Sequence, residues 1–474
     1  MILKIAAKEI TNTVRDRRFH LGVVTLLVLL LLALGVGWHS YRENSALQRA
    51  AQASQREQFL NRKAANAHIA AHGGMTVFRP YNNLSIIDEG LDSYVGTSIF
   101  LEAHRSNDYQ NRPAERTAAV NRFGELTVAL VLQLFVPLLI ILLTYAAFAG
   151  EREQGTLRQV MSLGLHPRDF ALGKALGVSV PLLLILIPAA LLGVLALALS
   201  SSTLSASLPR MVWLSLGYTV YFVIFVSLGL CVSARARNSQ RALITLLGFW
   251  LVTCLIFPRL AADLGERIYS TAPPPEKTFA DASEQAHSFT ADYLARTKQL
   301  EAELLQKYNV KTRAELPVSV SALMLYRSEE EDTKAQRKKF TELFNQYQKQ
   351  NRLFQSLGIF APALAIQSVS MGLVGSDVAH FRHFAEQAEE YRYQMAQKLN
   401  EDLINHPFTD FQANRIAYHT RERAVYESIA PFEYAMPDWR WSAGHLVWPC
   451  IVLTLWLLGM LIAIGLFVAR MRID

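Results

Sequence analysis

The sequence GEREQGTLRQVMSLGLHPRDFALGK, residues 150–174, separates two apolar runs at residues 126–149 and 175–199. Each run is long enough to cross a bilayer, because a transmembrane helix needs about 20 predominantly apolar residues. The stretch between them is rich in charge and is short. It therefore predicts a polar loop that joins two membrane spans on one side of the membrane.

Apolar side chains recur at helical spacing inside this polar loop, which predicts a short helix with one apolar face. They belong to Leu157, Val160, Met161 and Leu163. Gly164 and Pro167 end this helix, because proline disfavours helical angles in the residue before it. An amphipathic helix between two spans offers a binding surface to a partner outside the membrane.

Apolar residues cluster in blocks along the 474-residue chain, which is typical of a membrane protein. The six predicted spans are residues 19–38, 126–149, 175–199, 211–233, 242–257 and 445–468. The fifth is the shortest of the six. The predicted fold class is an all-α membrane protein with six transmembrane helices and mostly helical domains outside the membrane.

Basic residues alternate with the spans, although the overall net charge is only +7. They precede the first span and follow the second, the fourth and the sixth, which predicts cytoplasmic loops and two cytoplasmic termini. Residues 39–125 and 258–444 are then extracytoplasmic, and they contain no cysteine that could form a disulfide. No basic stripe interleaved with aromatic residues appears, so nucleic acid is not an expected partner.

The first 18 residues predict an amphipathic helix that lies in the membrane interface and contacts lipid. Its apolar positions recur every four residues, at Ile2, Ala6, Ile10 and Val14. It ends in the basic residues Arg15, Arg17 and Arg18. An alternative is that these basic residues serve only to orient the first span.

Residues 353–374 are apolar but contain a proline and several polar residues. A seventh span here would place Arg470 and Arg472 outside, against the charge pattern. We interpret this stretch as an interfacial helix or a re-entrant hairpin against the bundle.

The chain lacks the glycine-rich loop Gly-x-x-x-x-Gly-Lys-Ser/Thr, so ATP and Mg²⁺ would bind to a separate subunit and no cofactor to this chain. Ionisable residues are almost absent from the spans, which argues against an ion-driven carrier. His68 and His72 have the i, i+4 spacing of metal ligands, but no cysteine and no His-Glu-x-x-His motif accompanies them. We expect ordinary surface histidines here, and a metal site, for example for copper or zinc, is the alternative.

The polar loop resembles the first cytoplasmic loop of ABC-2 type transporter permeases. The resemblance rests on Glu151, on Gln154-Gly155-Thr156-Leu157, and on Arg168 with Leu172-Gly173-Lys174. In that family the loop holds a coupling helix that docks in a groove of the ATP-binding subunit. The amino-terminal helix is similar to the family's interfacial elbow helix.

The resemblance implies roles for six loop residues: Glu151, Gly155, Thr156, Leu157, Val160 and Met161. Glu151 would be a polar anchor at the end of the second span. Leu157, Val160 and Met161 would fill the groove of the ATPase. The alternative interpretation is that the loop is only a well-capped turn between spans.

Residues 370–377, with His380, Phe384 and Tyr391-Arg392, resemble one subfamily of unknown function, the DUF3526 group, whose large extracytoplasmic domain lies between the last two spans. The resemblance implies a permease of an ATP-driven exporter in a bacterial inner membrane. Two permease subunits, identical or paralogous, would work with two cytoplasmic ATPases. Two alternatives are an ATPase-coupled transmitter of force or signal to a periplasmic partner, and a scaffold or receptor without an ATPase.

Overall fold

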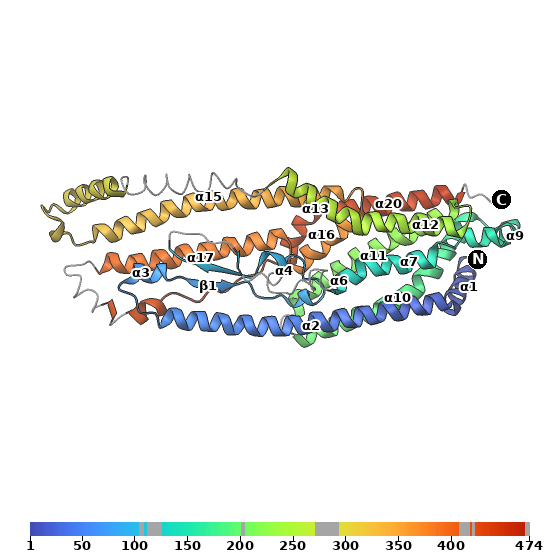
Figure 1. Cartoon of the computed structure of the whole chain (residues 1–474), viewed down its shortest axis with the longest axis horizontal. Coiled ribbons are helices and arrows are strands. Elements are labelled where there is room, and N and C mark those ends of the chain that lie inside the picture. The colour runs from blue at the N-terminus through green and yellow to red at the C-terminus, as the bar shows by residue number, and fades with distance from the viewer. Residues whose placement is uncertain are drawn as a thin grey trace.

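The computed structural model describes residues 1–103, 109–110, 126–200, 204–270, 293–406, 418–419 and 422–469. Helices run along one long axis and form an elongated molecule (Figure 1). Among the described residues, six helices are long and apolar enough to cross a membrane. This confirms the expected all-α fold class with six spans. Arg470 and Arg472 and parts of both segments expected outside the membrane (104–108, 111–125, 271–292, 407–417 and 420–421) lie outside the described residues.

The six candidate spans gather at the end of the molecule that carries the amino terminus (Figure 1). The first, third, fourth and sixth are α2 (Arg17–Leu60), α10 (Pro167–Ser200), α11 (Leu204–Arg235) and α20 (Val447–Ala469). The second joins α6 (Val128–Leu130), η3 (Val131–Phe135), α7 (Val136–Thr144) and α8 (Ala149–Glu153). The fifth joins α12 (Ser239–Trp250), η4 (Leu251–Ile256) and α13 (Phe257–Ile268), and is longer than the sequence indicated.

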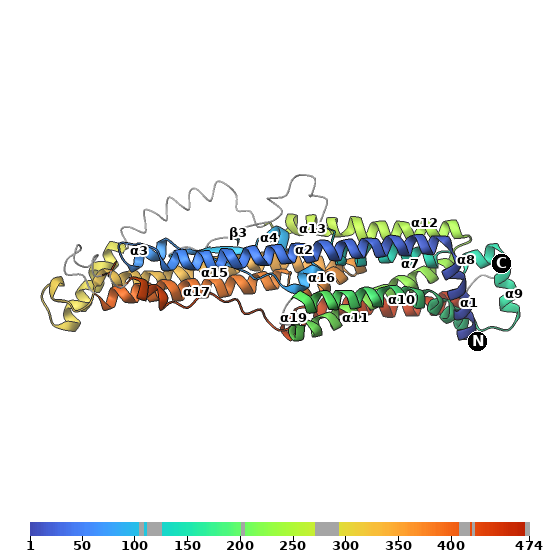
Figure 2. The same ribbon diagram turned by 90° about the horizontal axis from the view of Figure 1, so that it is seen from below.

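Helix α2 extends far beyond the first predicted span. Its 44 residues run without interruption from Arg17 to Leu60, a length of about 66 Å. Neither glycine nor proline occurs between Trp38 and Leu60, so nothing breaks the helix where it leaves the apolar layer. Figure 2 shows α2 as a single rod along most of the molecule.

A stretch of π-helix precedes the proline of the second span. Pro137 provides no N–H, and its ring crowds the carbonyl of Gln133. That carbonyl accepts a hydrogen bond of 3.0 Å from the Tyr221 hydroxyl of α11. The neighbouring span therefore satisfies the freed backbone oxygen, which is how proline is tolerated in a packed bundle.

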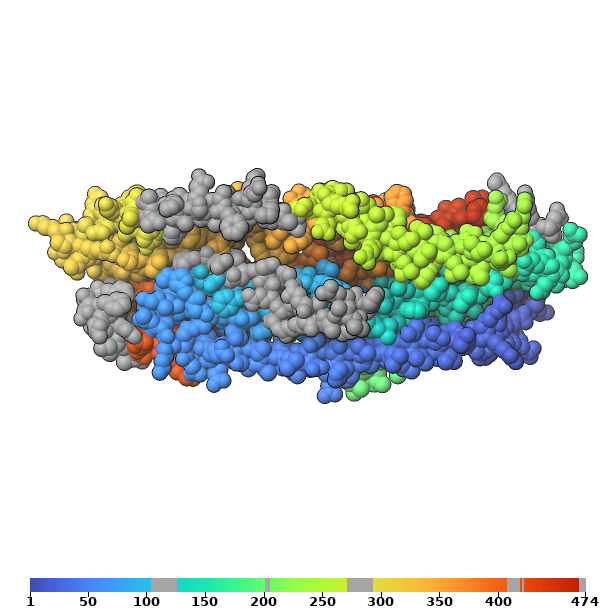
Figure 3. Space-filling model, viewed as in Figure 1, coloured from blue at the N-terminus to red at the C-terminus, as the bar shows by residue number. Residues whose placement is uncertain are grey.

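The other end of the molecule is the distal domain, made of the second half of α2, α3 (Ala67–His72), a small sheet, α15 (Val320–Leu357) and α17 (Val378–Asn405). The sheet is antiparallel, in the order β1 (Met75–Phe78), β2 (Ser98–Leu101) and β3 (Tyr109–Gln110), with Met75 opposite Leu101. Between β1 and β2 lie η1 (Asn83–Ile86) and α4 (Asp92–Val95). The space-filling view shows α2 and α13 on opposite edges of one face (Figure 3).

A buried ion cluster joins α15 to α17 in the distal domain. The Arg392 guanidinium is fully buried and donates to Glu329 at 2.5 Å and to Thr333 at 2.7 Å. It also contacts Glu389, one turn earlier on its own helix, at 2.8 Å. These four residues lie on α15 or α17, so their contacts fix how the two helices are aligned along their length.

Between the distal domain and the spans lies α16 (Pro362–Val374), which is almost entirely buried. The turn before it places the Gly358 carbonyl 3.0 Å from Nε1 of Trp456 in α20. Its apolar residues belong to the same core as the spans. The stretch 353–374 therefore consists of the end of α15, a tight turn and α16. With 13 residues, α16 is about 20 Å long, too short to cross a bilayer.

We expect Arg392→Ala to destabilise the distal domain by about 3–5 kcal/mol, because it leaves Glu329 as an uncompensated buried charge. Arg337→Ala is the matched control: Arg337 also joins α15 to α17, through Glu390 at 2.5 Å, but both side chains are about half exposed. Its loss should cost about 1 kcal/mol or less. Thermal unfolding of the purified protein measures both, and equal shifts would contradict this interpretation.

Candidate functional site

The polar end of the molecule is formed by α1 (Ile2–Arg15), by α8 at the end of the second span, and by α9 (Thr156–Ser162) (Figure 2). The short helix expected in the polar loop is α9. It begins after Gly155, whose φ is +73°, and it is followed by Gly164 with φ +75°. Both residues adopt the left-handed conformation that glycine tolerates best. Pro167 begins α10, because its fixed φ suits the first turn of a helix.

A buried lysine holds this end together. The Lys174 side chain is 2% exposed, and its ammonium lies 3.0 Å from Glu9 Oε1 and 2.9 Å from Glu151 Oε1. These three residues belong to α10, α1 and α8 respectively. One cation therefore ties the amino-terminal helix and the polar loop to the third span. Removing it would leave two carboxylates close together in a poorly hydrated place.

Aromatic rings and a second lysine complete the surroundings of this bridge. The Lys174 ammonium lies 4.8 Å from the centroid of the Phe170 ring and 5.8 Å from that of Phe148. Lys8 lies 3.9 Å from Glu151 Oε1 and is largely exposed. The faces of aromatic rings attract cations, so the rings favour the charged lysine while they exclude water.

Helix α8 is also fixed to the spans on its other side. The Arg152 guanidinium donates to the carbonyl oxygens of Ala234 at 2.9 Å and Ala236 at 2.5 Å, at the end of α11. The Glu153 carboxylate accepts from Ser239 Oγ at 2.6 Å, at the start of α12. The start of the polar loop is thus attached to the third, fourth and fifth spans as well as to the second, which ends in α8.

The six loop residues singled out in the sequence have different surroundings. Glu151 belongs to the lysine bridge, and Thr156 Oγ1 donates to the Glu151 carbonyl at 3.2 Å. Leu157 is fully buried in the chain's own core, so its side chain is not available to the groove of another subunit. Val160 and Met161 are half-buried beside the same core, and Gly155 is exposed.

Leu163, which follows α9, is 75% exposed and is the most prominent apolar side chain of the loop. Its neighbours Arg158, Gln159 and Ser162 are also exposed. The sequence pattern placed Leu163 on the same side of the expected helix as Leu157, because their spacing is close to that of one helical face. The helix ends at Ser162, however, and the next residue departs from that face.

Helix α1 lies across the polar end of the bundle, against α10 (Figure 2). A Cβ on Gly173 would lie 2.6 Å from Ile5, and one on Gly177 would lie 2.3 Å from Glu9, so only glycine permits this approach. Of the predicted apolar positions, Ala6 is buried, Ile2 and Ile10 are half-buried and Val14 is exposed. Arg15 and Arg17 are exposed, whereas Arg18 donates to the Tyr145 hydroxyl at 2.6 Å.

A second polar cluster lies where the spans meet the distal domain, and we call it the outer joint. Three carbonyl oxygens at the end of α16 accept side-chain hydrogen bonds from two other parts of the chain, the segment after β1 and the start of α11. Leu373 accepts from Arg210 at 2.8 Å, Val374 from Asn82 at 2.5 Å and Gly375 from Arg79 at 3.0 Å. Cations and donors at the carboxyl end of a helix are stabilising, because its last carbonyls lack helical partners.

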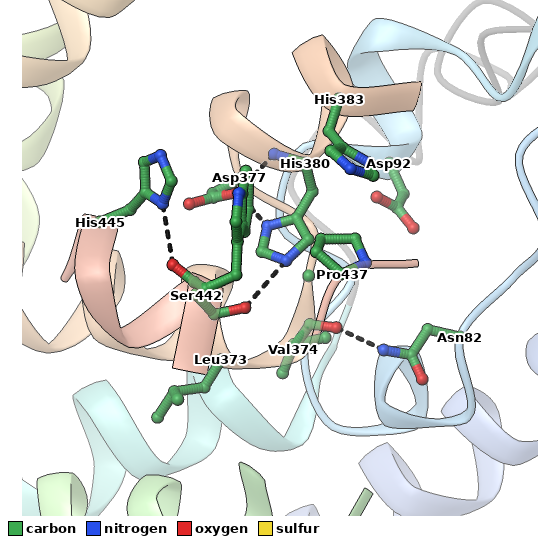
Figure 4. Close-up of polar contacts among 12 residues, drawn as sticks. Asn82, Asp92, Leu373, Val374, Asp377, His380, His383, Pro437, Ser442 and His445 are labelled. Carbon is green, nitrogen blue, oxygen red and sulfur yellow. Dashed lines mark hydrogen bonds and ion pairs between the residues drawn. The ribbon is translucent and has the colours of Figure 1, made fainter. Parts of the chain in front are cut away.

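Figure 4 shows the start of α17 beside these carbonyls. Asp377 caps α17 and contacts the His380 ring at 2.5 Å, while Nε2 of His380 lies 3.1 Å from Ser442 Oγ in α19 (Trp439–His445). Burial by itself would raise the pKa of Asp377, but the hydrogen bonds and charge of His380 bring that pKa below its usual value. The carboxylate is therefore charged at neutral pH.

Two hollows adjoin the outer joint. A cavity of about 650 Å³ has a mixed lining, in which Asp88, Gln133, Gln350 and Gln367 supply polar groups among apolar side chains. An apolar cavity of about 400 Å³ lies between α2, α10 and α11, and aliphatic side chains dominate its lining. Only the first offers several hydrogen-bonding groups to a polar solute.

The sequence matches the family model of ABC-2 family transporter proteins over residues 3–369. The chain belongs to this family. No curated protein matches the sequence. Membership identifies a multi-pass membrane protein, of the kind that forms the permease of an ABC exporter and works with a separate ATPase subunit. It does not distinguish the subfamily, and the match ends inside α16.

Lys174→Met should destabilise this ABC-2 protein by about 3–5 kcal/mol, because Glu9 and Glu151 then face each other without a cation. The triple variant Glu9→Gln, Glu151→Gln, Lys174→Met should regain at least half of that loss, since no unpaired charge remains. Thermal unfolding in detergent measures both. A triple variant less stable than Lys174→Met would show that the charges do not act as one group.

Proposed function

We propose that this chain is the permease subunit of an ATP-driven exporter and that α8 and α9 transmit the movement of a separate ATPase to the spans. The observation that carries the proposal is the lysine bridge. The buried Lys174 ammonium of α10 lies 2.9 Å from Glu151 of α8 and 3.0 Å from Glu9 of α1. A simple turn between spans needs no such attachment. A force-bearing loop does, because displacement of a loosely held loop would be lost before it reached the helices.

The docking surface proposed for the ATPase is the exposed side of the loop. It consists of Arg158, Gln159, Ser162 and Leu163, with the half-buried Val160 and Met161 at its edge. Leu157 takes the role of an internal anchor, because it is fully buried. A single large apolar side chain surrounded by polar ones is a typical centre of a small protein interface.

We further propose that the polar end faces the cytoplasm of a bacterium, with both termini inside and the distal domain in the periplasm. The positive-inside pattern supports this orientation. Two permease subunits, identical or paralogous, would form the pathway with two ATPases that bind ATP and Mg²⁺. The cavity of mixed lining beside the outer joint supports export, because it combines apolar surface with a few hydrogen-bonding groups where the spans end.

The proposed cycle begins when nucleotide binding draws the two ATPases together. Each ATPase then displaces α9, and the lysine bridge transfers that displacement to α1 and α10. Arg152 and Glu153 transfer it to α11 and α12. The spans therefore tilt as a unit, which is the rigid-body type of switching transition.

Leu163→Asp should abolish co-purification of the ATPase subunit from native membranes, because it places a charge at the centre of the docking surface. The permease itself should remain folded, since this side chain is 75% exposed. The measurement is mass spectrometry of proteins that accompany the tagged permease in mild detergent. Glu151→Lys, which reverses a charge of the bridge, should also reduce the yield of ATPase.

Leu294→Asp provides the matched control, because Leu294 is 57% exposed but lies in the distal domain. It should retain the ATPase at the wild-type level. If wild type brings no ATPase in several detergents, the exporter proposal fails and a scaffold or receptor becomes the better interpretation. If Leu163→Asp retains the ATPase, the docking surface lies elsewhere.

A second candidate function is transmission of force to a periplasmic partner, and the continuity of α2 favours it. Past residue 46, three side chains of α2 hold backbone carbonyls of the distal domain. Gln48 donates to Arg79 at 2.6 Å, Gln52 to Phe432 at 2.9 Å and Arg56 to Ile429 at 2.6 Å. A displacement of α2 in the membrane would therefore reach the distal domain directly.

Hydrogen exchange in the reconstituted complex distinguishes the two functions. Force transmission predicts that ATP changes amide exchange around residues 429–434, and that Ala46→Pro removes this change by breaking α2 between the membrane and the distal domain. Ala46→Glu, which keeps a helix-forming residue at this exposed position, should preserve the change. If ATP leaves exchange in the distal domain unaltered in wild type, only the exporter function stands.

A further inference from the structure

The two histidines of α3 lie with their ring nitrogens together in the distal domain. Nε2 of His72 is 3.1 Å from Nε2 of His68, and the ring planes are nearly perpendicular, at 88°. Zinc and similar ions bind imidazole nitrogen at about 2.0–2.1 Å, and two such bonds to nitrogens 3.1 Å apart enclose an angle of roughly 98°. This angle lies between square-planar and tetrahedral values, so a single ion could bind both nitrogens with little movement.

A hydrogen bond outside the pair fixes the proton of one histidine. Nδ1 of His68 lies 2.9 Å from Oδ1 of Asn400, and an amide oxygen can only accept. Nδ1 therefore carries the proton, and Nε2 of His68 presents its lone pair toward His72. Metal-binding histidines almost always have such a partner on the other ring nitrogen, which sets the tautomer and orients the ring.

The helix that carries the pair is held rigidly. Asn400 is 1% exposed in α17, and Ala67, Ala70 and Ala71 bury the other face of α3. The Asn66 side chain caps α3 through the Ile69 amide at 2.9 Å. Arg62 donates to the carbonyls of Ala70 at 2.9 Å and Gly74 at 2.7 Å. The two ring nitrogens thus lie on a preorganised support, which lowers the ordering cost of binding an ion.

We propose that His68 and His72 form a binding site for a divalent transition-metal ion of the Zn²⁺, Cu²⁺ or Ni²⁺ class. In the metal-free pair, Nε2–H of His72 donates to Nε2 of His68. On binding, that proton moves to Nδ1 of His72 through solvent, and the ion takes its place between the two Nε2 atoms. Imidazole ligands favour these ions over Mg²⁺ and Ca²⁺, which prefer oxygen.

Water or an added small ligand completes the coordination in this proposal. Across the described ranges no group of three or more His, Cys, Asp or Glu residues could hold a metal. Among the described residues the proposed site thus has two protein ligands, and an ion held by two ligands binds reversibly. Such a site suits a metal that is sensed or passed on, whereas a structural zinc site usually has four protein ligands.

Isothermal titration of Zn²⁺ into the full chain tests the proposal. The protein is purified in detergent without a polyhistidine tag and is stripped with EDTA. We expect one ion per chain, with binding at least tenfold weaker in His68→Gln and in His72→Gln, because either change removes the chelate. His406→Gln is the control, since this exposed histidine lies at the end of α17, where its ring contacts Asp402. It should bind as wild type does.

Asn400→Ala tests how much the hydrogen bond between Asn400 and His68 contributes to metal binding. It should weaken Zn²⁺ binding by roughly 10- to 100-fold without removing a ligand. Cu²⁺ in place of Zn²⁺ should give an electron paramagnetic resonance spectrum with two nitrogen couplings in wild type and one in His72→Gln. Melting temperatures in EDTA confirm that the variants fold, and His72→Gln is the safest because this side chain is exposed. Equal Zn²⁺ affinity in wild type and His72→Gln would overturn the proposal.

Discussion

The burial of the Lys174 ammonium is the constraint on which the polar end depends. A charge that is 2% exposed must be paired, and its two partners come from α1 and α8. Glycine at positions 173 and 177 lets α1 approach α10 closely enough for Glu9 to reach the lysine. The short distance between Lys174 and Glu9 therefore depends on these two glycines. The arrangement joins the polar loop, α1 and the third span through one buried cation.

The outer joint resolves a different problem, which is how a polar domain is attached to an apolar bundle. The end of α16 is buried, so its final carbonyls cannot bond to water. Arg210 from a span and Asn82 and Arg79 from the distal domain supply the missing donors. Each donor belongs to a part of the chain distant in sequence. The unsatisfied end of one short helix thus becomes the point where spans and distal domain are fixed to each other.

Much of the fold could be predicted from the sequence because it depends on local composition. The spans follow from long apolar runs, and α9 follows from the spacing of Leu157 and Val160 between glycines. The buried ion pairs, such as that between Lys174 and Glu9, could not be predicted in this way. Nothing near Lys174 or Glu9 in the sequence indicates that they meet, because the contact depends on how α1 packs. The sequence also could not show that Leu157 is buried and Leu163 exposed, since helical spacing identifies a face but not what covers it.

Helix α2 illustrates the limit of reading spans from hydropathy. The apolar run ends near Trp38, yet the helix continues to Leu60, because a change in polarity does not by itself end a helix and no glycine or proline interrupts it between Trp38 and Leu60. One continuous helix therefore joins the first span to the distal domain, where Gln48, Gln52 and Arg56 fix it to backbone carbonyls. The spans and the distal domain are thus held together both by α2 and by the outer joint, and this double attachment is the basis of the proposed transmission of movement between them.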